Sequence, residues 1–216
     1  MYVPKHFEER EIMVLHALIR SHPLGAWVTQ AAGALVVNHI PFLVDSEKGE
    51  HGTLIGHVAR ANPIWNSFSL EMDSMVIFQG PQGYISPSWY PSKHEHGKTV
   101  PTWNYAVVHA QGMPRAIEDR DWLLRHVTQL SDFHESTQAV PWNVSDAPPD
   151  YIDTMLNAIV GIEIPITTIA GKWKVSQNRT LPDKLGTIAG LEARADTNSR
   201  EVAALVQKHA SFKQDG

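Results

Sequence analysis

The alternation of apolar and polar positions along the chain predicts short strands joined mostly by tight turns. The predicted strands cover residues 26–29, 35–42, 53–59, 74–79, 102–117 and 158–170. The first two are separated by the small turn Ala31-Ala32-Gly33, as in a hairpin. In the last strand, Val160, Ile162 and Ile164 alternate onto one face. Short strands with hairpin-length connections favour a closed antiparallel barrel of about six strands over a parallel sheet.

Helical spacing appears at a few places between and after these strands. Residues 7–20 place Ile12, Leu15 and Ile19 on one face, with acidic residues in the first turn. The predicted helices cover residues 7–20, 118–134, 151–156, 181–194 and 199–209, and Asn62 is expected to cap a further short helix. The pattern therefore predicts a mainly β (α+β) fold with peripheral helices. We expect one barrel domain over residues 1–180 and a C-terminal helical extension over 181–216 that packs on it.

Composition narrows the classes of function. The 216 residues contain no Cys, which excludes disulfides, thiolate metal sites and a Cys nucleophile. The net charge of −5 argues against a dedicated nucleic-acid binder, because such proteins usually carry a basic excess. The sequence has no apolar run of membrane-spanning length, and its first residues do not form a signal peptide. We expect a cytoplasmic protein with no membrane partner.

The stretch from Gly83 to Tyr105 is the most unusual part of the chain. It contains two Trp, three Tyr and three Pro, and the prolines exclude a helix interior. Aromatic rings offer stacking faces, and hydroxyl and amide groups offer hydrogen bonds to the edges of a planar, polar ligand. The candidate residues are Ser86, Trp89, Thr102, Trp103 and Asn104. The alternative is a proline-stiffened loop that covers one end of a barrel.

Two cationic segments follow the ends of predicted strands. In Gly56-His57-Val58-Ala59-Arg60-Ala61-Asn62-Pro63, a strand ends at Arg60 and enters a helical turn, so a cation and free backbone N–H groups meet. That combination suits a phosphate, although a surface ion pair is the commoner role of such an Arg. The segment that begins Gly171-Lys172 and continues to Arg179 supplies Lys172, Ser176 and Gln177. Its alternative interpretation is a solvated basic turn.

Several familiar sites are missing from the sequence. It has no G-x-G-x-x-G fingerprint, no phosphate-binding P-loop and no G-x-S-x-G elbow. The segment His94-Glu95-His96 puts two imidazoles near each other, but chance pairs are expected in a chain with twelve His. We therefore predict no metal site.

Six segments, in order, resemble one known family. They are MYVPKHF, NHIPF, GHVARANP, YISPSWY, VPTWNY and GKWKVSQN. Together they resemble the PaiB family of FMN-binding split-barrel proteins, which are described as negative transcriptional regulators. The resemblance covers residues 1 to about 180 and continues more loosely through the closing helices. It implies a split β-barrel of the flavin-reductase and pyridoxamine-phosphate-oxidase kind. It also implies a homodimer with FMN at the subunit interface.

The candidate residues suit FMN on chemical grounds as well. Arg60, Lys172 and Ser176 offer the donors that a phosphate dianion needs, with His57 and Asn62 nearby in sequence. For the isoalloxazine, Trp89 and Trp103 offer flat faces. The amides of Asn104 and Gln177, with the hydroxyls of Ser86 and Thr102, offer edge partners.

Three functions remain open from the sequence. The resemblance implies a regulator, with DNA as a partner by resemblance only, because the sequence shows no helix-turn-helix and no basic face. A second possibility is an FMN-dependent oxidoreductase that uses NAD(P)H. A third is heme binding or degradation, since related split barrels include such proteins and the chain is rich in His.

Overall fold

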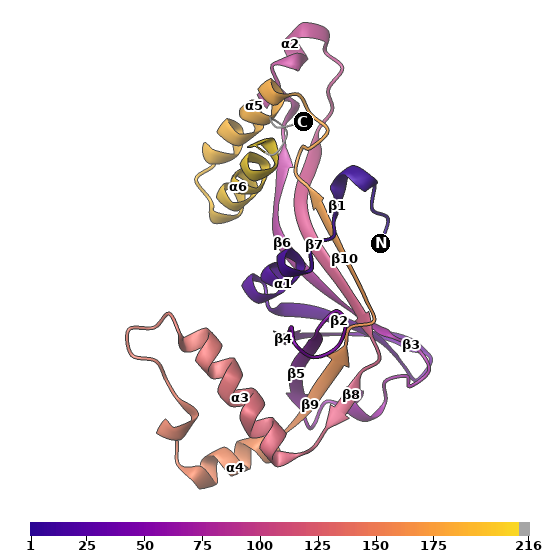
Figure 1. Ribbon diagram of the computed structural model, residues 1–216, viewed down its shortest axis with the longest axis vertical. Coiled ribbons are helices and arrows are strands. Elements are labelled where there is room, and N and C mark those ends of the chain that lie inside the picture. Colours follow the sequence, from indigo (N-terminus) through magenta and orange to yellow (C-terminus); the bar gives the residue numbers. More distant parts are fainter. Residues whose placement is uncertain (212–216) are drawn as a thin grey trace. The chain divides into compact units, whose positions relative to one another are not determined.

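The computed structural model describes residues 1–211, and the chain divides into two compact units (Figure 1). Unit 1 comprises residues 1–18, 79–108 and 170 onward, and unit 2 comprises 19–78 and 109–169. The chain therefore enters and leaves each unit more than once. Strands β6 (Ser74–Ile85), β7 (Thr102–Gly112) and β10 (Thr168–Lys174) contribute residues to both units.

Unit 2 contains two groups of antiparallel strands. In the first, β2 (Leu24–Ala31) pairs with β3 (Ala34–Pro41) as a hairpin and with the beginning of β6. Gly33, with φ at +78°, adopts the left-handed conformation that this tight turn requires. The second group is a four-stranded sheet, whose strands in spatial order are β4 (Leu43–Asp45), β5 (Thr53–Ala59), β9 (Ile159–Pro165) and β8 (Arg115–Ile117).

Helix α3 (Arg120–Glu135) packs on this four-stranded sheet. Asp119 caps the helix by accepting a hydrogen bond from the Trp122 amide at 2.7 Å. The indole of Trp122 covers Gly161 of β9 so closely that a Cβ at Gly161 would lie 2.2 Å from the ring. The remaining helices of unit 2 are η2 (Pro63–Asn66), η4 (Val144–Asp146) and α4 (Pro149–Asn157). The side chains of Trp27, Phe42 and Phe78 are almost fully buried in this unit.

Unit 1 is built on strands in the order β1 (Glu8–Glu9), β10, β7 and β6. Helix α1 (Ile12–Ser21) contributes its first residues, and Leu15 packs against Gly171 of β10. The other helices of this unit are η1 (Lys5–Phe7), η3 (Pro87–Trp89), α2 (Ser92–His96), α5 (Leu181–Glu192) and α6 (Thr197–Ser211). Figure 1 shows α5 and α6 side by side, and Leu191 and Val202 of these helices lie beside Gly83 of β6.

Helix α5 docks against η3 through two glycines. A Cβ on Gly186 would lie 1.9 Å from the carbonyl oxygen of Trp89, and one on Gly190 would lie 2.2 Å from the Trp89 indole. Each distance is well below a van der Waals contact, so only glycine allows the helix to approach this far. Helix α5 therefore holds η3, the aromatic segment that follows β6, in place.

The structure confirms an α+β fold with antiparallel sheets and corrects several boundaries. The first helix begins at Ile12 rather than at residue 7, because Glu8 and Glu9 pair with β10. Ten strands are present among the described residues, more than the six expected. The predicted strands 102–117 and 158–170 each divide in two, and the short strands β1 and β4 were not predicted. The predicted strand 53–59 agrees with β5, and Asn62 caps η2 as expected. The predicted domain boundary at residue 180 stays a prediction.

Candidate functional site

A hollow of about 390 Å³ lies on the exposed face of β6 and β7 in unit 1. Along β7, Trp103, Tyr105 and Val107 alternate onto this face, while Asn104 and Ala106 point into the interior. Gln79 and Gln82 of β6 complete the lining. Trp103 is 53% exposed, and its ring meets Tyr84 edge to face with the centroids 6.2 Å apart. The hollow thus combines aromatic faces with amide groups.

Two lysines of β10 lie beside the aromatic residues of this face. The Lys172 ammonium lies 5.5 Å from the centroid of the Tyr105 ring and donates to the Tyr2 carbonyl at 3.1 Å. The Lys174 ammonium donates to the Thr102 hydroxyl and, at 2.9 Å, to the Trp103 carbonyl. Burial lowers the pKa of Lys174; Tyr105 acts against this, and the positive charge of Lys172 lowers the pKa further. Two half-buried cations therefore border the hollow.

A hydrogen-bonded turn after β10 supports these strands from within. The Asn104 amide donates to the Ser176 hydroxyl at 2.9 Å, and both side chains are buried. Ser176 has φ at +64°, an uncommon left-handed conformation for a residue other than glycine. Gln177 accepts from the Val175 amide at 2.8 Å and donates to the Trp173 carbonyl. These three predicted contact residues thus hold the turn in place.

The residues predicted from the aromatic loop have structural partners as well. Ser86 caps η3 by accepting from the Ser88 amide at 3.2 Å. The indole of Trp89 lies against α5, with the Arg194 guanidinium 4.8 Å from its centroid. Arg194 also lies 5.8 Å from the Tyr84 ring. The loop is therefore a packed element rather than an open one.

The other three predicted residues, His57, Arg60 and Asn62, belong to unit 2. His57 Nδ1 lies 2.9 Å from His126 Nε2. The Arg60 guanidinium donates to Glu118 at 2.6 Å and to the carbonyls of Asn157 and Ile159 at 2.8 and 3.1 Å. Asn62 caps η2 and donates to Asn38 at 2.8 Å. Arg60 thus forms a surface ion pair with Glu118, which the sequence analysis gave as the alternative to a phosphate contact.

The structure brings the predicted residues together in two sets. Trp103 lines the hollow of unit 1 and the Lys172 ammonium lies beside the ring of Tyr105, while Arg60 lies in unit 2. A shared phosphate site for Arg60 and Lys172 therefore stays a prediction. Sequence reasoning missed Lys174 and Tyr105. Their signal was the alternation of Trp103-Asn104-Tyr105 and Lys172-Trp173-Lys174, which places each outer pair on one face of its strand.

Comparison with known proteins now identifies the family. Residues 1–168 match the family described as "Putative FMN-binding domain". The chain is also 32% identical over 207 residues to "Protease synthase and sporulation protein PAI 2" of Bacillus subtilis, and this match covers 96% of the chain and 97% of that protein. The chain belongs to this family, which is the PaiB family that its six sequence segments resemble.

Relatives of this PaiB family protein also occur in fungi. An uncharacterized protein of Saccharomyces cerevisiae is 35% identical over 164 residues, which cover 67% of the chain and 96% of the yeast protein. A second fungal relative, from Emericella nidulans, is 32% identical over 250 residues, with 99% of both chains covered. Sequence similarity to this chain therefore extends to fungal proteins, in one case over nearly the whole chain.

Solved structures confirm the predicted split-barrel fold class of this PaiB family protein. The flavocytochrome Anf3 of Azotobacter vinelandii superimposes with a TM-score of 0.55 at 13% identity, over 80% of this chain and 72% of that one. The FAD and heme binding protein of Mycobacterium smegmatis gives 0.53 at 13% identity, over 77% and 73%. At such low identity the likeness concerns the fold alone. No helix within residues 1–211 is long and apolar enough to cross a membrane.

Proposed function

We propose that this chain binds FMN on the exposed face of β6, β7 and β10 in unit 1. The observation that carries the proposal is the hollow lined by Trp103 and Tyr105 beside the ammonium groups of Lys172 and Lys174. The family match over residues 1–168 supports the same ligand. When bound, FMN supplies reversible electron transfer, which the side chains of the protein cannot carry out themselves.

The residues of this face fit the parts of FMN. The ring of Trp103 is exposed enough to stack on an isoalloxazine, and the amides of Gln79 and Gln82 offer hydrogen bonds to its edge. The two lysines offer positive charge to the phosphate. Since the Lys174 ammonium already donates to Thr102 and the Trp103 carbonyl, Lys172 is the freer of the two to turn toward a phosphate. His57, Arg60 and Asn62 stay predicted contacts.

Replacing Lys172 tests the phosphate contact. We expect Lys172→Met to weaken FMN binding by about ten- to a hundredfold, because a hydrogen bond to a charged group contributes roughly 1.5–3 kcal/mol. Riboflavin lacks the phosphate, so its affinity should change little. Titration of the intrinsic Trp fluorescence with each flavin gives both dissociation constants.

Lys208→Met is the matched control, because Lys208 is an exposed lysine of α6 in the same unit. It should leave both affinities unchanged. Equal weakening of FMN and riboflavin by Lys172→Met would show that Lys172 does not contact the phosphate. An absence of any flavin binding by the wild-type protein would refute the function itself.

We further propose that the protein is a homodimer with FMN at the subunit interface. The exposed aromatic residues support this, since Trp103 and Tyr84 are 53% and 37% exposed and such residues are enriched at interfaces. Light scattering of the flavin-loaded protein should give about twice the chain mass of 24.1 kDa. Trp103→Glu should give monomers, whereas Trp142→Glu, at an exposed Trp of unit 2, should not. A monomer mass for the wild-type protein with flavin bound is the contrary result.

The biological role that we propose is regulation of transcription, as the PaiB family is described. Similarity to PAI 2 over 96% of the chain supports this role. The assay that distinguishes a regulator from an oxidoreductase is oxidation of NAD(P)H by the flavin-loaded protein. Sustained turnover with a soluble electron acceptor would assign an enzyme instead.

A further inference from the structure

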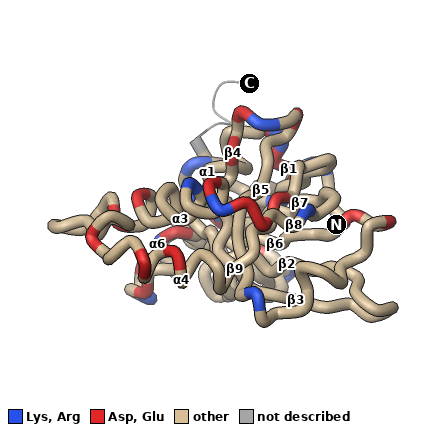
Figure 2. The backbone as a smooth tube through the Cα atoms, turned by 90° about the horizontal axis from the view of Figure 1, so that it is seen from below, with Lys and Arg blue, Asp and Glu red and all other residues tan. Residues whose placement is uncertain are grey.

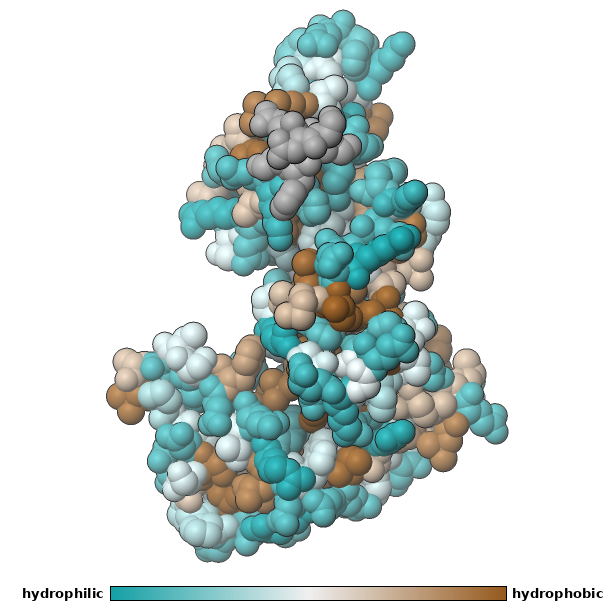
Figure 3. All heavy atoms as spheres, viewed as in Figure 1, coloured by the Kyte–Doolittle hydropathy of each residue, from teal (hydrophilic) through white to brown (hydrophobic). Residues whose placement is uncertain are grey.

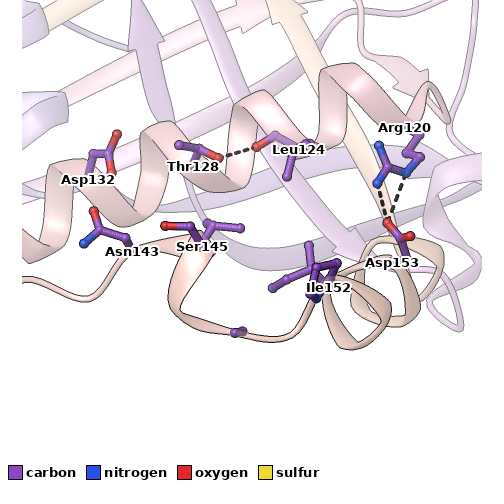
Figure 4. A pocket seen from close by; sticks show the side chains of 11 residues that line it. Arg120, Leu124, Thr128, Asp132, Asn143, Ser145, Ile152 and Asp153 are labelled. Carbon is purple, nitrogen blue, oxygen red and sulfur yellow. Dashed lines mark hydrogen bonds and ion pairs between the residues drawn. The ribbon is translucent and has the colours of Figure 1, made fainter.

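A slot of about 530 Å³ runs along α3 in unit 2 (Figure 4). It shares no lining residue with the hollow of unit 1. One wall is the face of α3 that carries Arg120, Leu124, Thr128 and Asp132 at intervals of four residues. The opposite wall is the segment from Asn143 to Asp153, which contains η4 and α4. This volume is within the range of small-molecule sites, roughly 300–1,000 Å³.

The middle of the slot is apolar. Leu124 of α3 faces Ile152 of α4, and Val144, Ala147 and Pro149 continue the apolar lining. In Figure 3, brown apolar residues appear among teal ones on the surface where α3 and α4 lie. An alkyl chain or a ring of a ligand would therefore be removed from water along this middle part.

The cationic end of the slot is already neutralised. The Arg120 guanidinium donates through Nε and Nη2 to the Asp153 carboxylate, with the Nε contact at 3.1 Å. It also lies 3.5 Å from the Asp121 carboxylate. These contacts raise the pKa of Arg120, led by its hydrogen bonds to Asp153. An anionic ligand would have to displace a carboxylate to reach this Arg.

The opposite end has a carboxylate with no such partner. Within residues 1–211, Asp132 makes no hydrogen bond or ion pair with another side chain. Figure 4 shows it at the far end of the slot from Arg120, opposite Asn143. Close by, the Thr128 hydroxyl donates to the Leu124 carbonyl at 2.8 Å, which leaves its oxygen as an acceptor. The free groups at this end are therefore mainly acceptors.

The surroundings of the slot are strongly acidic. Residues 118–153 contain eight Asp and Glu but only two Arg and no Lys. Figure 2 marks acidic residues in red along α3 and α4. This field attracts cations and repels anions.

We propose that the slot binds an amphiphilic primary amine. The ammonium group would lie between Asp132, Thr128 and Asn143, and the apolar body would lie along Leu124 and Ile152. This site is separate from the proposed flavin site, and its ligand is a different class of molecule.

The test uses three probes with the same tail and different head groups: octylamine, octanol and octanoate. Isothermal titration calorimetry of the full chain near pH 7 should show octylamine binding with a dissociation constant of about 1 mM or tighter, from the usual efficiency per heavy atom. Octanol should bind about tenfold more weakly, and octanoate more weakly still. Higher salt should weaken octylamine but not octanol, because only the amine pairs with an exposed charge.

Asp132→Asn should weaken octylamine by about tenfold and leave octanol unchanged. The matched control is Asp150→Asn, which removes an exposed acid of α4 outside the slot. It should leave both affinities unchanged, and thermal melting will show whether each variant is folded. Equal affinity for the three probes, equal weakening by the two variants, or no binding of octylamine would each overturn the proposal.

Discussion

Gly186→Ala is expected to destabilise unit 1 by about 3 kcal/mol. In the middle of a helix, Gly→Ala normally stabilises by roughly 0.5–1 kcal/mol, because alanine has less backbone freedom to lose. Here the added methyl group would lie 1.9 Å from the Trp89 carbonyl oxygen, which belongs to the backbone and cannot rotate away. Overpacking typically costs about 1–3 kcal/mol, and this contact is at the severe end. Chemical denaturation monitored by circular dichroism measures the change.

The matched control is Gly83→Ala, because the same added methyl group there would be 3.4 Å from Leu191, an ordinary contact. It should change the free energy of unfolding by less than about 1 kcal/mol. If Gly186→Ala stabilises the protein as an ordinary helical position does, α5 does not dock on η3 as the structure shows.

The second large effect is expected from acid, through His57 and the buried His126. Burial, and then the neighbouring His57, lower the pKa of His126 from 6.5 to about 4, and burial also lowers the pKa of His57. Below pH 6.5, His126 is therefore protonated in the unfolded chain, whereas in the folded chain it stays neutral until about pH 4. The contribution of the neutral His126 to the free energy of unfolding is fully present above about pH 6.5 and is lost as the pH falls toward 4. His126 alone should remove about 3 kcal/mol by pH 4.

The charges around His126 do not reverse this direction. Lys48, Arg125, Asp45 and Glu163 line a small hollow beside it, and the Lys48 ammonium pairs with the Glu163 carboxylate at 2.5 Å. Trp122 stacks on the His126 ring with the centroids 5.4 Å apart. The imidazole therefore has an aromatic face and the Lys48–Glu163 ion pair for neighbours, while the Asp45 carboxylate accepts a hydrogen bond from the Glu47 amide at 3.1 Å.

Denaturation curves collected between pH 7 and pH 4 measure this effect. His126→Gln keeps an amide next to His57 but removes one titrating group, so its stability should fall less steeply with acid than that of the wild type. His134→Gln removes an exposed imidazole from the same helix and should follow the wild-type curve. Parallel curves for His126→Gln and the wild type would contradict the assignment.

Local patterns predicted the strands and helices well where one signal dominated. The alternation in residues 53–59 and the cap at Asn62 are confirmed by β5 and η2. The prediction failed where two signals competed. Acidic residues at 8 and 9 resemble a helix start, but the Glu9 carboxylate accepts from the Glu11 amide at 2.9 Å while its backbone pairs with β10. That pairing joins residues more than 160 positions apart, and no local pattern contains it.

The candidate site shows the same limit. Trp103 and Lys172 were predicted from composition, because exposed aromatic and cationic residues near strand ends are visible in the sequence. The alternation in the sequence places Tyr105 with Trp103 and Lys174 with Lys172, but only the pairing of β10 with β7 brings the two pairs together. The contact between His57 and His126 joins residues 69 positions apart and has no sequence signal at all. Reasoning from a single sequence thus misses the contacts that depend on pairing between distant strands and helices.

The interleaving of the two units also constrains how this chain can evolve. Unit 1 is assembled from three stretches of sequence and unit 2 from two, so neither is encoded by a continuous stretch. Recombination at a single junction therefore cannot replace one unit without cutting the other, and neither can be borrowed by another gene as a module. Changes in the hollow on β7 and in the slot along α3 must accumulate by substitution within one inherited chain.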